Sequence, residues 1–243
     1  ALRTNTTGAD NCAFGYEALY YNTTGHSNSA VGRGALITNT TGVNNTAVGY
    51  KSLFLTTTGS YSTACGHTAL YSNTTGAYNN AFGREALYSN TTGTGLTAVG
   101  QQALSQNTTG NNNVAMGGYS ASGGVYACLY ANTTGHSNSG YGVGSLRTNT
   151  TGVENSAFGY RALHFATTAG YNQAFGTRAL YTNTTGAYNT SLGYETLLLS
   201  TTGSYNSAVG DYALATNTTG ASNSALGYHA ARVSTTAHYT VAI

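Results

Sequence analysis

The chain has 243 residues, of which only 6% are charged, and its formal net charge is +2. The charged residues are scattered singly, so the chain lacks the basic patches with which proteins bind nucleic acid or anionic membranes. No apolar run approaches the length of a membrane span. The three cysteines are an odd number without a pairing pattern, which favours buried free thiols over a disulfide framework.

A 17-residue repeat fills the chain from end to end. The copy at residues 73–89 reads N-T-T-G-A-Y-N-N-A-F-G-R-E-A-L-Y-S. The fourteen copies begin at Asn5, Asn22, Asn39, Thr56, Asn73, Asn90, Asn107, Asn132, Asn149, Ala166, Asn183, Ser200, Asn217 and Ser234. Every spacing is 17 residues except one of 25. A fixed period of this length predicts a solenoid, and positions are counted below from the first residue of each copy.

Several positions of the repeat hardly vary. Threonine occupies positions two and three in all fourteen copies, and glycine occupies position eleven in every copy that reaches it. Position seven is usually Asn, position nine is nearly always Ala, and position ten is apolar. Position fifteen is leucine except at Ala231, and this column is the predicted core ladder: Leu19, Leu36, Leu53, Leu70, Leu87, Leu104, Leu129, Leu146, Leu163, Leu180, Leu197 and Leu214.

This pattern predicts short strands joined by tight corners. Two fixed glycines and a Thr-Thr pair in every copy disfavour helix. We expect strands at positions one to three, eight to ten and fourteen to sixteen, with corners at the glycines of positions four and eleven and at the Asn of position seven. The predicted fold is all-β: a parallel β-solenoid of about fourteen coils, with a core of Leu, Val or Phe, and Ala. We expect residues 1–243 to form a single repeat domain, with a loop insertion at 118–125.

The consensus N-T-T-G-x-x-N-x-A-x-G-Y-x-A-L resembles the 17-residue repeats of phage-like tail-fibre and other surface-fibre proteins. Its A-x-G-x-x-A core, with Ser in the last slot at residues 47–52, is also similar to the head repeats of trimeric autotransporter adhesins. Those head repeats are shorter and lack the N-T-T-G segment. The resemblance implies a parallel β-roll at the cell or virion surface, with a trimer around the axis as one arrangement.

The tripeptide N-T-T is an N-glycosylation acceptor. It occurs in ten copies: Asn5, Asn22, Asn39, Asn73, Asn90, Asn107, Asn132, Asn149, Asn183 and Asn217. In the other four copies the Asn is replaced while Thr-Thr remains, which indicates an outward-facing Asn that tolerates loss. Covalently attached carbohydrate along this edge is one interpretation, and a bare ladder of Asn and Thr is the other.

Tyrosine and threonine also form columns. The 21 tyrosines recur mainly at positions six, twelve and sixteen, where stacked rings suit contacts with sugars, with a neighbouring copy, or simply with one another. One rank of threonines could face solvent and bind ice, either Thr6, Thr23 and Thr40 or Thr7, Thr24 and Thr41.

Catalysis finds no support in the sequence. The six histidines lie at different positions of the repeat, and none adjoins a matched carboxylate or cysteine. We therefore expect no catalytic residue, no metal site and no cofactor.

The most consistent function is mechanical: a structural subunit of an extracellular fibre that forms a head-to-tail homopolymer. The sequence begins at position fourteen and stops at position ten, so Ala1 and Leu2 of one copy are expected to stack near Val241, Ala242 and Ile243 of the next. The alternatives are a receptor- or glycan-binding shaft of a tail fibre or adhesin, and an ice-binding solenoid.

Overall fold

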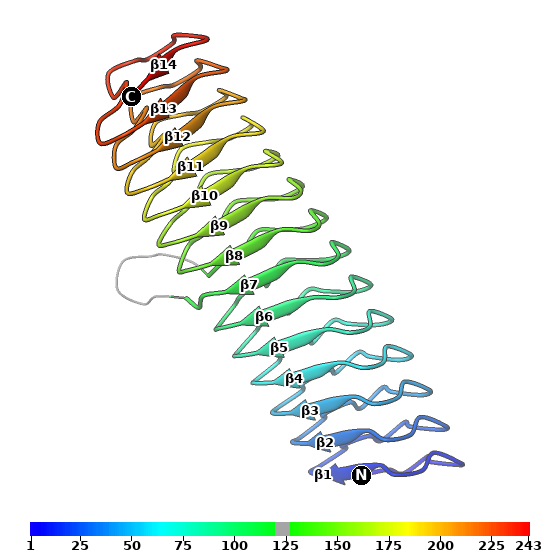
Figure 1. The fold of residues 1–243 in the computed structure, drawn as a ribbon. Helices are drawn as coiled ribbons and strands as arrows, with labels where there is room; N and C mark the ends of the chain where they lie inside the picture. The colour runs from blue at the N-terminus through cyan, green and yellow to red at the C-terminus, as the bar shows by residue number, and fades with distance from the viewer. Residues whose placement is uncertain (120–126) are drawn as a thin grey trace. The chain divides into compact units, whose positions relative to one another are not determined.

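The computed structural model describes residues 1–119 and 127–243, and this part of the chain contains strands, turns and bends but no helix (Figure 1). The chain divides into two compact parts, Ala1–Asn113 and Val114–Ile243. The first part holds β1 (Cys12–Phe14), β2 (Ser29–Val31), β3 (Thr46–Val48), β4 (Thr63–Cys65), β5 (Asn80–Phe82) and β6 (Thr97–Val99). The second part holds β7 (Val114–Met116), β8 (Ser139–Tyr141), β9 (Ser156–Phe158), β10 (Gln173–Phe175), β11 (Thr190–Leu192), β12 (Ser207–Val209), β13 (Ser224–Leu226) and β14 (Val241–Ala242).

Within each part, every coil contributes one short strand that pairs in parallel with the strand of the next coil. In the first part Ala13 pairs with Ala30, and Ala30 pairs with Ala47. Partners in these ladders lie one repeat apart, which confirms the predicted all-β parallel β-solenoid with a 17-residue period. A single domain over residues 1–243 stays a prediction. The predicted insertion at 118–125 falls mostly on residues 120–126, outside the described residues.

Only one of the three predicted strand segments, at positions eight to ten, is a strand. Left-handed backbone at positions six, thirteen and fifteen interrupts the rest of each coil. In the third coil these residues are Asn44, Lys51 and Leu53, with φ angles of 56°, 51° and 50°. A strand needs a strongly negative φ at every residue. The left-handed leucine at position fifteen therefore rules out the predicted strand at positions fourteen to sixteen. The described part of the chain has no strand at positions one to three either, so both predictions are wrong.

Coils nevertheless bond to one another outside the strands. The amide of Thr23 donates to the carbonyl of Thr40 at 3.0 Å, and the amide of Leu19 donates to the carbonyl of Ala35 at 3.0 Å. These contacts join position two to position two, and position fifteen to position fourteen, of successive coils. Backbone groups that would be unpaired in an isolated coil are thus satisfied by stacking.

The two fixed glycines have different physical reasons. At position eleven the backbone is left-handed, with a φ of 135° at Gly32, a region that glycine enters without steric cost. At position four the constraint is space, because a Cβ on Gly25 would lie 2.4 Å from the carbonyl oxygen of Gly42 in the next coil and 2.5 Å from Asn22 Oδ1. The predicted corner at the Asn of position seven is misplaced, because the left-handed residue is one position earlier.

Leucine and alanine fill the interior of each coil. In the second coil Ala30, Ala35 and Leu36 are all fully buried. The position-fifteen leucines are fully buried throughout both parts: Leu19, Leu36, Leu53, Leu70, Leu87, Leu104, Leu129, Leu146, Leu163, Leu180, Leu197 and Leu214. Left-handed backbone costs a leucine about 1–2 kcal/mol, and burying its side chain contributes about 1.5–3 kcal/mol, so the inward side chain offsets the strain of its own corner.

The apolar residues of position ten lie outside this core. In β2 Ala30 is fully buried, whereas Val31 is 39% exposed. Successive side chains of a strand point to opposite faces, so an inward alanine at position nine directs positions eight and ten outward. The prediction that the Val or Phe of position ten belongs to the core is wrong. Buried asparagines take that place inside the coil.

Candidate interaction surface

The asparagines of position one are turned inward. Asn22 is fully buried, and its Nδ2 donates to Asn5 Oδ1 at 2.7 Å and to the carbonyl of Gly25 at 2.9 Å. Asn39 donates to Asn22 Oδ1 at 2.8 Å in the same way. Asn5 is exposed, but all the other glycosylation candidates are fully buried: Asn22, Asn39, Asn73, Asn90, Asn107, Asn132, Asn149, Asn183 and Asn217. The predicted outward orientation is wrong for these residues, and a glycan on their Nδ2 atoms does not fit inside the coil stack.

A second asparagine ladder runs along position seven. Asn28 Nδ2 donates to the carbonyl of Gly42 in the next coil at 2.8 Å, and Asn28 Oδ1 accepts from the backbone amide of Asn45 at 3.0 Å. The carbonyl of Gly42 also accepts from Asn39 Nδ2 at 3.0 Å. Where both asparagines are present, the glycine corner is thus held by both ladders, which explains why Asn at positions one and seven and Gly at position four tend to recur together.

The position-one ladder breaks where the Asn is replaced. The Oδ1 atoms of Asn39, Asn149, Asn183 and Asn217 are buried without a hydrogen-bond partner. Each of these residues is followed, one coil later, by a residue other than Asn: Thr56, Ala166, Ser200 or Ser234. An unpartnered buried acceptor costs about 1–3 kcal/mol, so these breaks are weak points in the stack.

The two threonine columns have different environments. At position two the side chain is half-buried and bonds between coils; Thr23 Oγ1, for example, donates to the carbonyl of Thr40 at 2.9 Å. At position three the side chain is exposed, as at Thr24 and Thr41. Of the two threonine columns considered for ice binding, only the one at position three reaches solvent. It contains Thr7, Thr24 and Thr41.

Tyrosines at position six stack on one another along the coils. In the first part the rings of Tyr61 and Tyr78 lie 5.1 Å apart with an interplanar angle of 3°. In the second part Tyr171 and Tyr188 lie 4.7 Å apart, and Tyr188 and Tyr205 lie 5.1 Å apart, each pair at 2°. In both groups the tyrosine rings cover one another's faces. A ligand would therefore meet mainly the ring edges and phenol oxygens.

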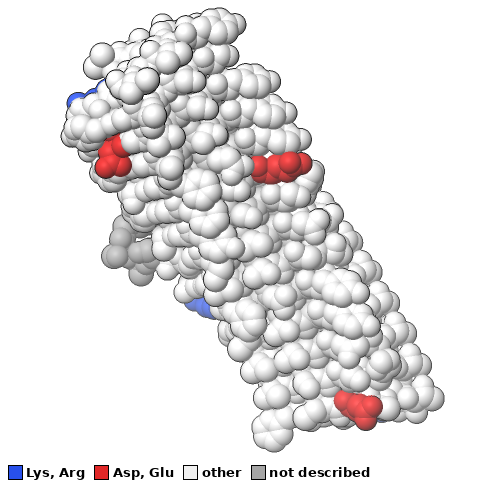
Figure 2. Space-filling model, viewed as in Figure 1, with Lys and Arg blue, Asp and Glu red and all other residues white. Residues whose placement is uncertain are grey.

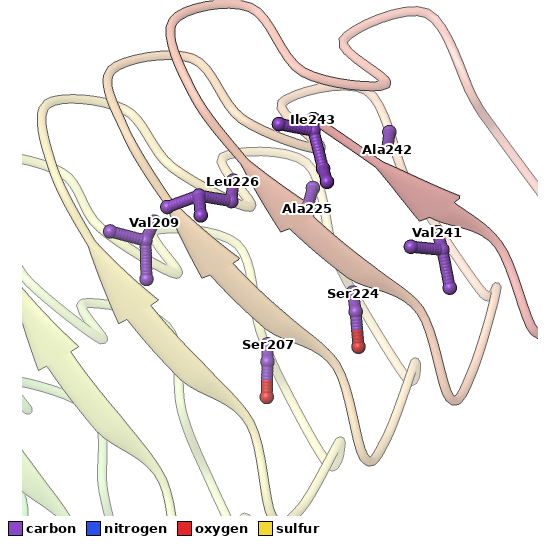
Figure 3. Close-up of a pocket in the computed structure, with 8 residues that line it drawn as sticks. All are labelled: Ser207, Val209, Ser224, Ala225, Leu226, Val241, Ala242 and Ile243. Carbon is purple, nitrogen blue, oxygen red and sulfur yellow. The ribbon is translucent and has the colours of Figure 1, made fainter.

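The outer face of the sheet presents two parallel columns, at positions eight and ten. Around β12–β14 it forms an open hollow of about 340 Å³. Figure 3 shows Val209, Leu226 and Ile243 in one row of this hollow and Ser207 and Ser224 in a second row. Positions eight and ten are called the sheet face below.

The sequence contained a signal for this surface. The buried position fifteen is leucine in every copy that reaches it except at Ala231, whereas position ten varies among Phe, Val, Cys, Met, Tyr, Leu and Ile. A buried column in a regular stack demands one shape, while an outer column needs only apolar character. Cys65 belongs to this face and is exposed, as is Cys12 in β1, so the prediction of buried thiols holds for Cys128 alone.

Charged side chains are few, and those in view lie apart from one another (Figure 2). Arg178 Nη1 donates to Glu195 Oε1 at 2.6 Å, linking position thirteen of adjacent coils. At the same position in the first part, Gln102 Nε2 donates to Glu85 Oε2 at 2.8 Å, and this bond, with help from Arg84, lowers the pKa of Glu85. Both are contacts between position thirteen of adjacent coils, and Glu195 is buried in its pair.

Two buried titratable groups have shifted pKa values. Burial lowers the pKa of His164 to about 4, although its Nδ1 lies 2.7 Å from the carbonyl of Gly144. Burial also raises the pKa of the Cys128 thiol to about 12, and Ser145 Oγ donates to its Sγ at 3.0 Å. In the described ranges His, Cys, Asp and Glu form no group of three that could hold a metal ion. The part of the chain that the structure describes also has no helix able to cross a membrane.

The residues predicted to join successive copies lie in the first and last coils. The amide of Leu2 donates to the carbonyl of Ala18 at 3.1 Å, while Ala1 is exposed. Ala242 pairs with Ala225, and the flanking Val241 and Ile243 are exposed. Their contact with another copy stays a prediction.

Comparison with known proteins returns no family model, no curated protein and no solved structure that matches this chain. The 17-residue β-solenoid repeat is therefore the extent of the classification.

Proposed function

We propose that the chain is a structural subunit of an extracellular fibre or filament. The observation that carries the proposal is the use of the buried polar residues. In coil after coil, the asparagines of positions one and seven bond to the adjacent coil: Asn39 Nδ2 donates to Asn22 Oδ1, and the backbone amide of Asn45 donates to Asn28 Oδ1. Because the buried polar side chains bond each coil to its neighbours, the stack is suited to bearing mechanical load along the solenoid axis.

The outer columns support the same function. Tyr171, Tyr188 and Tyr205 form a continuous stack, and the sheet face repeats one kind of side chain at every coil. Such surfaces offer the same contact many times rather than one localised site. The resemblance of the consensus to tail-fibre and surface-fibre repeats agrees with this, and it motivates the proposed location at a cell or virion surface.

The fibre function is tested by sedimentation and electron microscopy of the purified chain. Pelletable filaments with an axial repeat of about 4.8 Å, the spacing of neighbouring strands, are the expected result. A protein that stays in the supernatant as isolated particles under all assembly conditions would contradict the function.

A second candidate is a glycan-binding shaft, and the tyrosines at position six favour it. Tyr61, Tyr78 and Tyr188 have φ angles of 57°, 58° and 58°, a region in which Asn, Asp or Gly is less strained. Other coils do carry Asn44 and Asn112 at this position. Tyrosine is therefore kept for its surface, because the backbone alone would favour Asn. Binding to a glycan array that is lost in Tyr188→Asn would support this candidate; the absence of any glycan signal would remove it.

The ice-binding alternative depends on the exposed threonines of position three. The neighbouring position five varies among residues such as Val43, Ser60 and Ala77, so a regular second rank does not flank the threonines. Thermal hysteresis that disappears in Thr41→Lys would support ice binding, and its absence in the unmodified chain would remove it.

A further inference from the structure

The sheet face is an exposed apolar surface in both parts of the chain. Its position-ten residues in the first part are Phe14, Val31, Val48, Cys65, Phe82 and Val99. In the second part they are Met116, Tyr141, Phe158, Phe175, Leu192, Val209, Leu226 and Ile243. Val48 is 39% exposed, Phe82 42%, Leu192 49% and Leu226 56%. The apolar side chains therefore form a column on the outside of each part.

No charged residue interrupts this face. Positions eight and ten carry Ser, Thr, Asn, Gln, Cys or apolar residues in all fourteen copies. Protein surfaces that stay free of partners usually mix charged residues of both signs and avoid contiguous apolar patches. Contiguous exposed apolar patches larger than a few hundred Å² mark interaction sites. The composition of the sheet face is therefore that of a covered surface.

The area is sufficient for a specific contact. An aromatic side chain offers about 150–250 Å² for burial, so the partly exposed position-ten residues of the second part together leave on the order of 500 Å² outside. Two such faces in contact would bury about 1,000 Å², the lower bound of stable protein interfaces. The second part alone reaches this size, and the first part carries a face of the same kind.

From this we infer that the sheet face binds the sheet face of a second copy of this chain, side by side. A partner must present apolar groups at the spacing of the coils, and another copy does so because its column has the same 17-residue period. The stacked rings of Tyr141, Phe158 and Phe175, with centroids 4.5 Å and 4.8 Å apart, present their edges at that spacing. A partner without the repeat would match only a few coils.

This inference rests on the proposed fibre function for its biological meaning, since it names the lateral contact between copies. The two ideas fail separately. Oligomers that form without filaments would support the lateral contact and count against the fibre. Filaments in which the copies do not pair through the sheet face would overturn the lateral contact and leave the fibre standing.

The experiment measures the mass of the full chain by sedimentation equilibrium or light scattering, in the fraction that stays in solution after any filaments have been pelleted. We expect the unmodified chain to have a mass of at least twice the 24.9 kDa of the monomer. Val48→Lys and Leu192→Lys place a charge in the sheet face of each part, and the double variant should return the mass to that of the monomer. Val48→Leu keeps the face apolar and should retain the oligomer.

Matched controls lie in the same two coils. Thr41 and Thr185 are exposed at position three, away from the sheet face, so Thr41→Lys/Thr185→Lys adds the same charge and should leave the oligomer intact. Circular dichroism establishes that every variant is folded. A monomeric unmodified chain, or loss of the oligomer in the control as readily as in the sheet-face variant, would overturn the inference.

The thiol of Cys65 gives an independent readout, because it is exposed on the sheet face in the single chain. Pairing should slow its labelling by a maleimide several-fold as protein concentration rises, and Val48→Lys should restore fast labelling. Unchanged labelling across concentrations would overturn the inference. Binding of the monomeric chain to neutral lipid vesicles through this face, in place of self-association, would overturn it as well.

Discussion

The break in the asparagine ladder at Ala166 offers a direct test of how the coils are held together. Asn149 Oδ1 is buried without a partner, and one coil later the ladder position is Ala166. Position four of that same coil is Ala169, although twelve of the fourteen copies have Gly there. In an intact coil a Cβ at position four would lie too close to the Asn of position one, at 2.5 Å for Gly76 and Asn73 Oδ1. The two alanines are therefore a coupled replacement.

The perturbation is the double substitution Ala166→Asn/Ala169→Gly. The new amide would donate to Asn149 Oδ1, and its own oxygen would accept from Asn183 Nδ2, which now donates to the carbonyl of Gly186 at 2.9 Å. Satisfying a buried acceptor recovers about 1–3 kcal/mol, and the added glycine costs about 0.5–1 kcal/mol in chain entropy. We expect the double variant to raise the free energy of unfolding by about 1–2 kcal/mol.

Urea denaturation followed by circular dichroism measures this change for the double variant and both single variants. Ala166→Asn alone should destabilise, because the Ala169 Cβ occupies the space that the new side chain needs. Ala169→Gly alone should also destabilise slightly, so the cycle should show a favourable coupling between the two positions. A double variant no more stable than the unmodified chain would refute the role assigned to the ladder.

Three further predictions use other residues of the same structure. Leu70→Ala should lower the free energy of unfolding by about 2–5 kcal/mol and Val48→Ala by less than about 1 kcal/mol, measured by urea titration of the monomer; equal losses would contradict the inward and outward assignments. The pKa of His164 is about 4 when folded, below its usual 6.5, so the unfolded state binds the proton first and stability should fall as the pH drops from 6.5 towards 4. His164→Phe should remove that part of the pH dependence, and an unchanged profile of unfolding midpoint against pH would contradict it. With its pKa raised to about 12, Cys128 should react with a thiol reagent at neutral pH only after unfolding, while the other two thiols react at once in the dilute monomer, where the sheet face is uncovered; a third fast thiol in the folded protein would count against its burial.

The sequence was sufficient for the architecture because the period alone determines which residues stack. A 17-residue spacing places Ala30 beside Ala47 whatever the path of the coil, and the invariant leucine column is explained by one buried shape repeated at each level. The glycines of positions four and eleven marked where the backbone comes close or turns. These inferences needed no knowledge of which face each strand presents.

The repeat period does not predict which side chains point into the coil and which point to solvent. The sequence predicts Asn39 on the outside, but it is fully buried, and it predicts Val48 in the core, but Val48 is exposed. Polarity misleads here because stacked amides satisfy one another: Asn39 Nδ2 has two acceptors within 3.0 Å inside the coil. The left-handed backbone at positions six, thirteen and fifteen was not predictable from the sequence either, because Tyr61, Lys51 and Leu53 are residue types that seldom adopt that conformation.

The most direct test of the account is a cryo-electron microscopy reconstruction of the assembled chain. The account predicts coils stacked about 4.8 Å apart, with the asparagines of position one enclosed and the sheet face covered by a neighbouring copy. Density for sugars on the position-one asparagines, or a sheet face open to solvent throughout the assembly, would contradict it.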